Sequence, residues 1–250
     1  MKLKALFGVL LLTLSACVTI QPVRDANDIP PDVTNWAQNN VMSVFTLQQG
    51  FGSGFWVDNE TFVTACHVVG SEEYVKTGDA SNDWEVQWVV QDEVLVANWN
   101  LSTSLDLAVK SCNQETDIAI LKRQWYPSDS DYTALPATYA HPNPEQGSTV
   151  YGAGFGLMEK LYISVGHWQH KPLYPDHDRN YMITAPTVPG DSGSPALDYK
   201  NGVVRIVGIR QSGRVYRSGF APPVFIPHLI KVSDAMSIHA EVEKFKAGES

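Results

Sequence analysis

The chain has 250 residues, of which 44% are hydrophobic, and this is enough for one domain or two small ones with an ample core. Its formal net charge is −9 at neutral pH, and the sequence contains no run of basic residues. An acidic chain of this kind argues against nucleic acid as a partner, because binding to a phosphate backbone depends on clustered lysine and arginine.

The first sixteen residues predict an export signal. A short charged start is followed by an apolar run that ends at Ala16 and is too short to span a membrane. The run closes with Leu14-Ser15-Ala16-Cys17, which looks like the lipobox of bacterial lipoproteins and implies a lipidated Cys17 after cleavage. Each buried CH₂ of an acyl chain contributes about 0.8 kcal/mol, so two or three chains anchor a protein stably. The alternative is an ordinary signal peptide with a chance cysteine.

The residues after the signal predict an outer-membrane location, on the periplasmic side or the surface, and a tether. Val18 stands where an aspartate would resemble an inner-membrane retention signal. We therefore expect a lipid-anchored protein of the cell envelope, at the outer membrane if the cell has one. Residues 17–40 are polar, contain prolines and lack periodicity, so we expect them to tether the folded part to the membrane.

From residue 41 onward the chain consists of short segments rich in β-branched and aromatic residues. In the first half we expect strands at 41–48, 54–57, 61–65, 84–90, 93–99, 105–110 and 117–122, and we expect 84–90 and 93–99 to form a hairpin. In the second half we expect strands at 148–152, 161–167, 181–184, 194–198, 203–211 and 223–226. A 3.6-residue periodicity predicts a helix and tail over 229–250. Many short strands indicate an all-β barrel or sandwich.

One tight turn carries a candidate nucleophile. Ser192 lies in Gly190-Asp191-Ser192-Gly193-Ser194-Pro195, where flanking glycines let backbone N–H groups point into one small space. A serine hydroxyl needs a base and donors for the oxyanion. His67 closes a hydrophobic segment, and Asp117 opens another in which a carboxylate needs a partner such as a histidine N–H. Each residue alone also fits an ordinary structural role, in a turn, in the core or at a strand end.

The three motifs occur in the order His, Asp, Ser and closely resemble the trypsin-like (chymotrypsin-fold) serine proteases. The motifs are Thr64-Ala65-Cys66-His67, Asp117-Ile118-Ala119-Ile120-Leu121 and the Ser192 turn. The bacterial branch with HtrA-type and glutamyl-specific endopeptidases is the most similar. The resemblance implies two six-stranded antiparallel β-barrels, over residues 41–130 and 131–228, with a C-terminal helix. It also implies hydrolysis of protein or peptide substrates without a cofactor.

By the same resemblance, Ser192 is the nucleophile, His67 the general base and Asp117 the residue that orients His67. The backbone N–H groups of Gly190 and Ser192 would form the oxyanion hole. The sequence has no Ile-Val-Gly-Gly activation motif, so we do not expect activity to await a new N-terminus beside Asp191. The alternative function is a non-catalytic binding or scaffold protein on the same fold.

The family's primary specificity pocket lies beside the serine, and the matching residues here are Pro186, Thr187, Arg210, Ser212 and Gly213. Pro186 stands where trypsin has an acidic residue, so cleavage after Lys or Arg is not expected. Glutamyl-specific relatives have Thr and His where this chain has Thr187 and Arg210, and a guanidinium binds carboxylates well. One hypothesis is therefore an acidic P1 residue. In the other, Arg210 faces solvent or pairs with an acid and leaves a small apolar pocket.

The remaining cysteines flank the candidate site. Cys66 precedes His67, and Cys112 lies five residues before Asp117. A disulfide is allowed in an exported protein, and two buried free thiols are the alternative. The histidines at 167, 170 and 177 lie in an irregular segment whose spacing matches no zinc template, so we predict no metal site.

Overall fold

The computed structural model describes residues 29–46, 50–76, 84–98, 103–124, 132–156, 160–169, 180–216 and 224–248. The predicted signal peptide, Cys17 and the first part of the predicted tether lie outside these ranges. Within the described ranges, no helix combines the length and the apolar character needed to cross a membrane.

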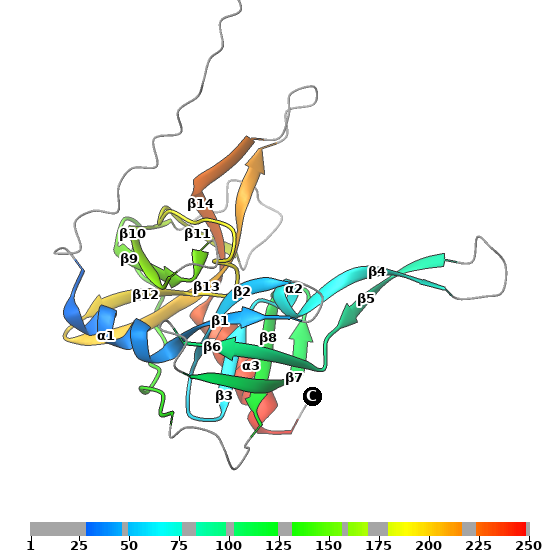
Figure 1. Ribbon diagram of the computed structural model, residues 1–250. Helices are drawn as coiled ribbons and strands as arrows, with labels where there is room; N and C mark the ends of the chain where they lie inside the picture. Colours follow the sequence, from blue (N-terminus) through cyan, green and yellow to red (C-terminus); the bar gives the residue numbers. More distant parts are fainter. Residues whose placement is uncertain are drawn as a thin grey trace, which may run out of the picture.

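Six antiparallel strands close the first barrel in the order β1-β2-β3-β8-β7-β6 (Figure 1). They are β1 (Val41–Phe45), β2 (Phe51–Trp56), β3 (Thr61–Thr64), β6 (Glu93–Ala97), β7 (Ser104–Asn113) and β8 (Ile118–Arg123). Val94 and Val96 are buried, whereas the alternating residues Glu93 and Leu95 are exposed, as the period of two in a strand requires. Because the barrel is closed, none of these six strands is left with an unpaired edge of backbone N–H and C=O groups.

The second barrel also has six antiparallel strands, in the order β10-β11-β14-β13-β12-β9. They are β9 (Thr149–Gly154), β10 (Tyr162–Gln169), β11 (Asn180–Ile183), β12 (Pro195–Lys200), β13 (Val203–Tyr216) and β14 (Val224–Asp234). The predicted fold class is confirmed: the molecule is all-β, with two six-stranded barrels and a C-terminal helix.

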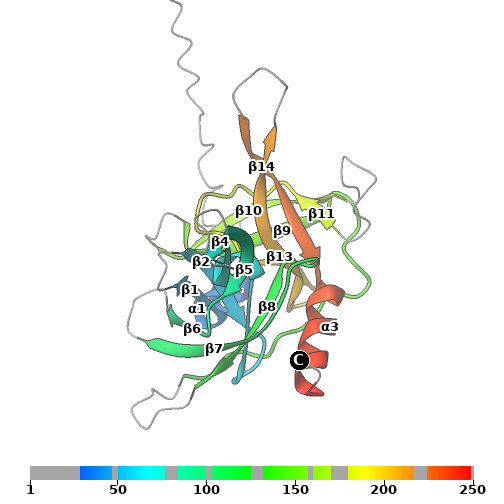
Figure 2. The ribbon, with the colours of Figure 1, turned by 90° about the vertical axis from the view of Figure 1, so that its right-hand side faces the viewer.

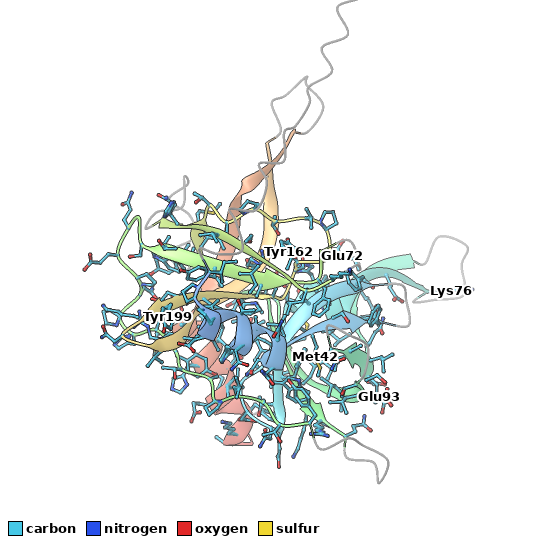
Figure 3. The ribbon with its side chains drawn as sticks, turned by 60° about the vertical axis from the view of Figure 1, so that its left-hand side comes forward. Met42, Glu72, Lys76, Glu93, Tyr162 and Tyr199 are labelled. Atoms are coloured by element: carbon cyan, nitrogen blue, oxygen red, sulfur yellow. A yellow bond between two sulfur atoms is a disulfide. The ribbon has the colours of Figure 1, made fainter. Side chains whose placement is uncertain are left out.

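The predicted hairpin between residues 84–90 and 93–99 is wrong. Strand β5 (Trp84–Val90) pairs with β4 (Gly70–Lys76), and the two form an arm that projects from the first barrel (Figure 1). Strand β6 pairs with β1 and β7 instead. Figure 3 shows Met42 in the body of the molecule and Lys76 at the outer end of the arm. The short connection at residues 91–92 suggested a hairpin, but long-range pairing decided the partners.

The predicted tether over residues 17–40 is wrong for its last ten residues, which form helix α1 (Pro31–Asn40). Proline in the first turn suits a helix start, because its missing N–H has no partner there anyway. Val33, Trp36, Ala37 and Asn40 are buried and recur at helical spacing. This face is short and carries a polar residue, so it does not stand out in the sequence. The helix packs onto both barrels and belongs to the fold.

The C-terminal helix begins later than the predicted residue 229. Strand β14 continues to Asp234, and helix α3 runs over Ala235–Lys246. Ile230 and Val232 fit a helical pattern and a strand equally well, and pairing with β11 decided for the strand. The Asp234 carboxylate caps the helix by accepting the Ser237 N–H at 2.7 Å. Figure 2 shows α3 lying beside β8 of the first barrel.

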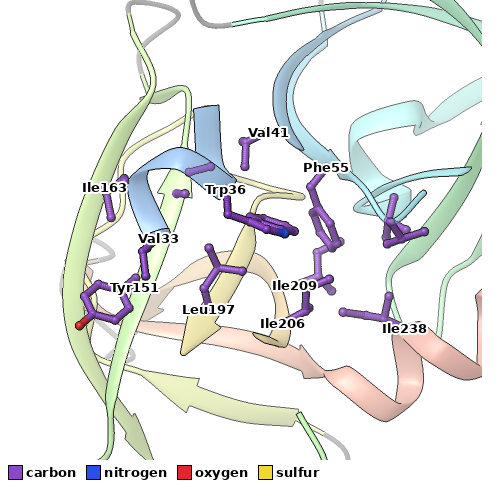
Figure 4. Packing of buried hydrophobic residues seen from close by; sticks show 14 of the residues in the cluster. Val33, Trp36, Val41, Phe55, Tyr151, Ile163, Leu197, Ile206, Ile209 and Ile238 are labelled. Carbon is purple, nitrogen blue, oxygen red and sulfur yellow. The ribbon is translucent and has the colours of Figure 1, made fainter. Parts of the chain in front are cut away.

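The largest buried cluster bridges the two barrels, so they form one packed unit (Figure 4). Its centre is Trp36 of α1, whose ring lies 6.4 Å from that of Phe55 on β2. The second barrel contributes Leu197 and Ile209, and α3 contributes Ile238. A shared core fixes the relative position of the barrels, and therefore the relative position of the side chains that the barrels bring together.

Candidate active site

His67 and Asp117 form a close pair on the first barrel. His67 lies in the single-turn helix α2 (Cys66–Val69) that follows β3. Its ring Nδ1 is 2.7 Å from Asp117 Oδ2, and its backbone N–H donates to Asp117 Oδ1 at 3.0 Å. The two side chains are 38% and 20% exposed. A neutral ring that donates from Nδ1 keeps a lone pair on Nε2, so His67 can act as a base toward a third group.

The turn before β8 holds Asp117 in a special backbone conformation. Asp117 has a φ of 55°, in the left-handed region that aspartate tolerates better than most residues. Its carbonyl accepts the Cys66 N–H at 3.2 Å. A disulfide joins Cys66 to Cys112, with 5.1 Å between the Cα atoms. The predicted disulfide alternative is therefore confirmed, and it links the residue before His67 to the strand end before Asp117.

The Ser192 turn needs its two glycines. Gly190 and Gly193 have φ values of +102° and +85°. A Cβ on Gly193 would lie 2.2 Å from the Ser53 carbonyl oxygen, and one on Gly190 would lie 2.5 Å from the Phe51 ring. Ser53 also donates its N–H to the Ser192 carbonyl and its Oγ to the Gly190 carbonyl, both at 2.8 Å. Two hydrogen bonds from Ser53 thus hold the turn against strand β2 of the first barrel.

Ser192 lies next to the His67 helix, but its hydroxyl has another partner. A Cβ on Gly52 would be 2.7 Å from the Val68 side chain and 3.0 Å from the Ser192 carbonyl oxygen, so both flank one glycine. Ser192 Oγ donates to the Gln211 carbonyl at 2.8 Å. Among the described residues, no hydrogen bond joins Ser192 Oγ to His67. The structure therefore brings the three predicted residues into one region and forms one of the two hydrogen bonds of a triad.

Asp191, beside the candidate nucleophile, is the centre of a buried polar network. It is 1% exposed and lies 3.4 Å from Arg210 Nη2, which is equally buried. Its Oδ2 accepts the Thr187 hydroxyl at 2.8 Å, the Val188 N–H at 2.9 Å and the Tyr162 hydroxyl. Burial raises the pKa of Tyr162, and Asp191 raises it further against the opposing effect of Arg210, so the phenol stays protonated and donates.

The predicted use of Thr187 and Arg210 to bind an acidic side chain is wrong, because both donate to the interior. Arg210 Nε donates to Ser194 Oγ at 2.6 Å, and Nη1 donates to the Pro186 carbonyl at 3.5 Å. With Asp191 as its ion-pair partner, the guanidinium is neutralised inside the barrel. Arg210 therefore pairs with an acid, as in the second of the two hypotheses for this residue.

Ser212 and Gly213 lie in β13 and take part in its backbone pairing. They pair with Lys231 and Ile230 of β14, after a register shift between Arg210 and Ser212. The pairing between β12 and β13 ends at Ile209, whereas β13 continues along β14 as far as Tyr216.

Several site residues were missed in the sequence. Gln211, Ser233 and Asn113 contact the Asp117 turn, and Ser53 contacts the Ser192 turn. Ser53 had a local signal, since Gly52-Ser53-Gly54 marks a place where backbones approach closely. The others are ordinary polar residues in or at the ends of strands, and only tertiary contacts give them a role. The predicted non-metal segment around His170 and His177 lies outside the described residues.

Comparison with known families gives one match. The profile described as "Trypsin-like peptidase domain" matches residues 52–209, which is more than half of the chain. This range contains His67, Asp117 and Ser192. No curated protein matches the chain significantly.

Solved structures with the same fold include two proteases. The active form of the Rv3671c protease from M. tuberculosis superposes with a TM-score of 0.62 at 18% identity, covering 89% of this chain and 87% of that one. The inactive form gives a TM-score of 0.55 at 18% identity, covering 86% and 95%. The HtrA-type protease AlgW with a tripeptide gives 0.61 at 15% identity, covering 85% of this chain and 62% of that one.

Proposed function

The chain belongs to the trypsin-like peptidase family and is a serine endopeptidase, and from this premise we propose that His67, Asp117 and Ser192 are its catalytic triad. The observation that supports this assignment most is the doubly bonded His67–Asp117 pair beside the glycine-bounded Ser192 turn. Protein or peptide chains are the substrates, and no cofactor takes part.

In the proposed reaction, Ser192 Oγ attacks the carbonyl carbon of the peptide bond and His67 Nε2 takes its proton. Asp117 keeps the proton on Nδ1 and stabilises the imidazolium that forms. His67 then gives the proton to the leaving amine. A water molecule then attacks the acyl-enzyme. His67 takes the proton of this water and afterwards gives it to Ser192 Oγ, which leaves as the free hydroxyl.

The backbone N–H groups of Gly190 and Ser192 are proposed to hold the oxyanion. Among the described residues, neither N–H has an acceptor, whereas the neighbouring Gly193 N–H donates to the Arg210 carbonyl at 2.7 Å. One such donor contributes about 3 kcal/mol to the transition state. For attack, Ser192 Oγ must exchange its hydrogen bond to the Gln211 carbonyl for one to His67.

Labelling with a fluorophosphonate tests this proposal, because the probe reacts with an activated serine. We expect the mature protein to label, Ser192→Ala not to label, and Asp117→Asn to label about 10⁴-fold more slowly. Circular dichroism of each variant checks that it is folded.

The alternative, a non-catalytic binding protein on the same fold, is favoured by one observation. Ser192 Oγ is bonded to the Gln211 carbonyl and not to His67. A folded wild-type protein that fails to label and cleaves no peptide in a library would support this alternative.

We propose a small neutral P1 residue. The acidic alternative required donors that face a substrate. The Thr187 hydroxyl donates to Asp191, and the buried Arg210 guanidinium is ion-paired with Asp191 and donates to Ser194 and the Pro186 carbonyl. The substrate adds as a strand to β13 beyond Ile209, where the pairing with β12 ends. In peptides varied at P1, we expect cleavage after Ala and Val. Preferred cleavage after Glu would contradict the assignment.

We propose that the mature protein is anchored to the cell envelope through a lipidated Cys17. The motif Leu14-Ser15-Ala16-Cys17 at the end of a short apolar run supports this. Mass spectrometry of the mature N-terminal peptide should find acyl groups on Cys17, and Cys17→Ala should release the protein from membranes. A mature N-terminus at any other residue would contradict the anchor.

A further inference from the structure

We infer that Gln211, Ser233 and Glu241 are positioning residues that hold the turn carrying Asp117. None of the three belongs to the first barrel, which contributes the turn itself: they lie on β13, β14 and α3. The catalytic consequence rests on the proposed function, whereas the structural consequence for the turn does not.

Gln211 and Ser233 hold the carbonyl of the peptide unit that leads into Asp117. Gln211 Nε2 donates to the Thr116 carbonyl at 2.7 Å and to Ser233 Oγ at 2.6 Å. Ser233 Oγ donates to the same Thr116 carbonyl at 2.5 Å. Both amide hydrogens of Gln211 and the hydroxyl hydrogen of Ser233 are used, and the carbonyl accepts two bonds. Gln211 and Ser233 are each 2% exposed, so water does not compete for these contacts.

Glu241 acts on the other end of the turn through Asn113. Glu241 Oε1 accepts from Asn113 Nδ2 at 2.9 Å. The amide oxygen of Asn113 accepts the N–H groups of Glu115 at 3.0 Å and Thr116 at 3.3 Å. The carboxylate therefore fixes which face of the Asn113 amide points toward the turn. Without it the amide is free to rotate away from these two backbone donors.

The turn needs such support because of the conformation at Asp117. A φ of 55° is sparsely populated for residues other than glycine, and it persists only where surrounding contacts hold it. The carboxylate that must face His67 projects from this residue. The Gln211 carbonyl also accepts the Ser192 hydroxyl at 2.8 Å. Gln211 of the second barrel thus contacts both Ser192, the candidate nucleophile, and the Thr116 carbonyl that leads into Asp117.

The test compares the rate of fluorophosphonate labelling in the full mature protein. We expect Gln211→Leu and Glu241→Ala to label about tenfold more slowly, as a lost buried hydrogen bond predicts. Ser233→Ala removes one hydroxyl and serves as the mildest variant if Gln211→Leu fails to fold. Glu241→Gln keeps an acceptor for Asn113 and should restore labelling to near the wild-type rate.

Two matched controls separate positioning from general destabilisation. Lys244→Ala removes the other partner of Glu241, 3.2 Å away and largely exposed, and should leave the rate unchanged. In an Asp117→Asn background, measured at higher probe concentration, Gln211→Leu should cause no further loss, because residues that act through Asp117 lose their effect without it.

Hydrogen exchange gives a readout that does not depend on activity. We expect the amides of residues 113–117 to exchange faster in Glu241→Ala and Gln211→Leu, and at the wild-type rate in Lys244→Ala. Wild-type rates of labelling and exchange in both variants would overturn the inference, and so would a full tenfold loss in the Asp117→Asn background. Faster exchange in a protein whose wild type never labels would contradict the proposed function and leave the positioning role intact.

Discussion

At the residue scale, the network around Asp191 shows how buried polar groups shape the Ser192 turn. A buried carboxylate is costly unless it is paired and hydrogen-bonded. Here Arg210 supplies the charge, while Thr187, Tyr162 and a backbone N–H supply donors. All of these partners come from the folded chain itself. No newly cleaved N-terminus is needed to neutralise Asp191, which agrees with the absence of an activation motif.

This network predicts a loss of stability at alkaline pH. Burial raises the pKa of Tyr162 above its ordinary value of 10.0, as it does for Tyr132 and Tyr139. Unfolded tyrosines release their protons as the pH rises through about 10, whereas the folded ones keep theirs. The contribution to stability is therefore complete below pH 10 and declines above it. Urea denaturation from about pH 8 to about pH 11 should show this decline, with a smaller slope in Tyr162→Phe. An identical slope in that variant would contradict the assignment to Tyr162.

At the element scale, a covalent connection joins helix α2 to the end of β7, just before the turn that holds Asp117. The disulfide between Cys66 and Cys112 closes a loop with a sequence separation of 46 residues, which contains the β4–β5 arm. It joins the two segments that carry His67 and Asp117. Such a link restricts the unfolded chain and also holds the two segments together in the folded state.

Removal of this disulfide should destabilise the protein. We expect the double variant Cys66→Ser with Cys112→Ser to lose about 2–4 kcal/mol in the free energy of unfolding, measured in urea. Reductant should lower the stability of the wild type and leave the double variant unchanged. Equal stability of the wild type with and without reductant, after confirmed reduction, would show that the link contributes little.

At the scale of the whole molecule, the barrels share one core, and the candidate site lies where they meet. Trp36 of α1 is 4% exposed and packs between Phe55 of the first barrel and residues of the second. Ser53 bonds to the Ser192 turn, and Gln211 bonds to the Asp117 turn, so each barrel holds a segment of the candidate site that the other barrel contributes. The geometry of the site therefore depends on the docking of the barrels.

The shared core predicts cooperative unfolding of both barrels. Wild type should unfold in one transition that intrinsic fluorescence and circular dichroism report alike. Trp36→Ala should lower the stability by about 3–5 kcal/mol, because a large buried side chain is lost from the centre. Met236→Ala, at a position that is 39% exposed, should change it by less than about 0.5 kcal/mol. Separate transitions for the two halves of the wild type would contradict a common core.

Short-range patterns in the sequence predicted the all-β class and most strands, and three motifs predicted the two barrels and the candidate triad. The fold predictions succeed because strand propensity and glycine-bounded turns are local properties of the chain. The triad stays a prediction. The partner of β5 and the start of α3 were predicted wrongly. In both cases the local pattern fits two structures, and distant strands decide between them.

The sequence by itself determined which side chains are candidates for chemistry: a serine in a glycine-bounded turn, a histidine after a strand and an aspartate before another. The tertiary structure alone decided how they are held and what the neighbouring polar residues do. The sequence suggested Arg210 as a donor for an acidic substrate side chain, whereas in the structure it is buried and paired with Asp191. Gln211 and Ser233 gained a role only when folding brought them to the Thr116 carbonyl. Pairing between buried polar groups depends on contacts between residues far apart in the chain, and no local pattern contains that information.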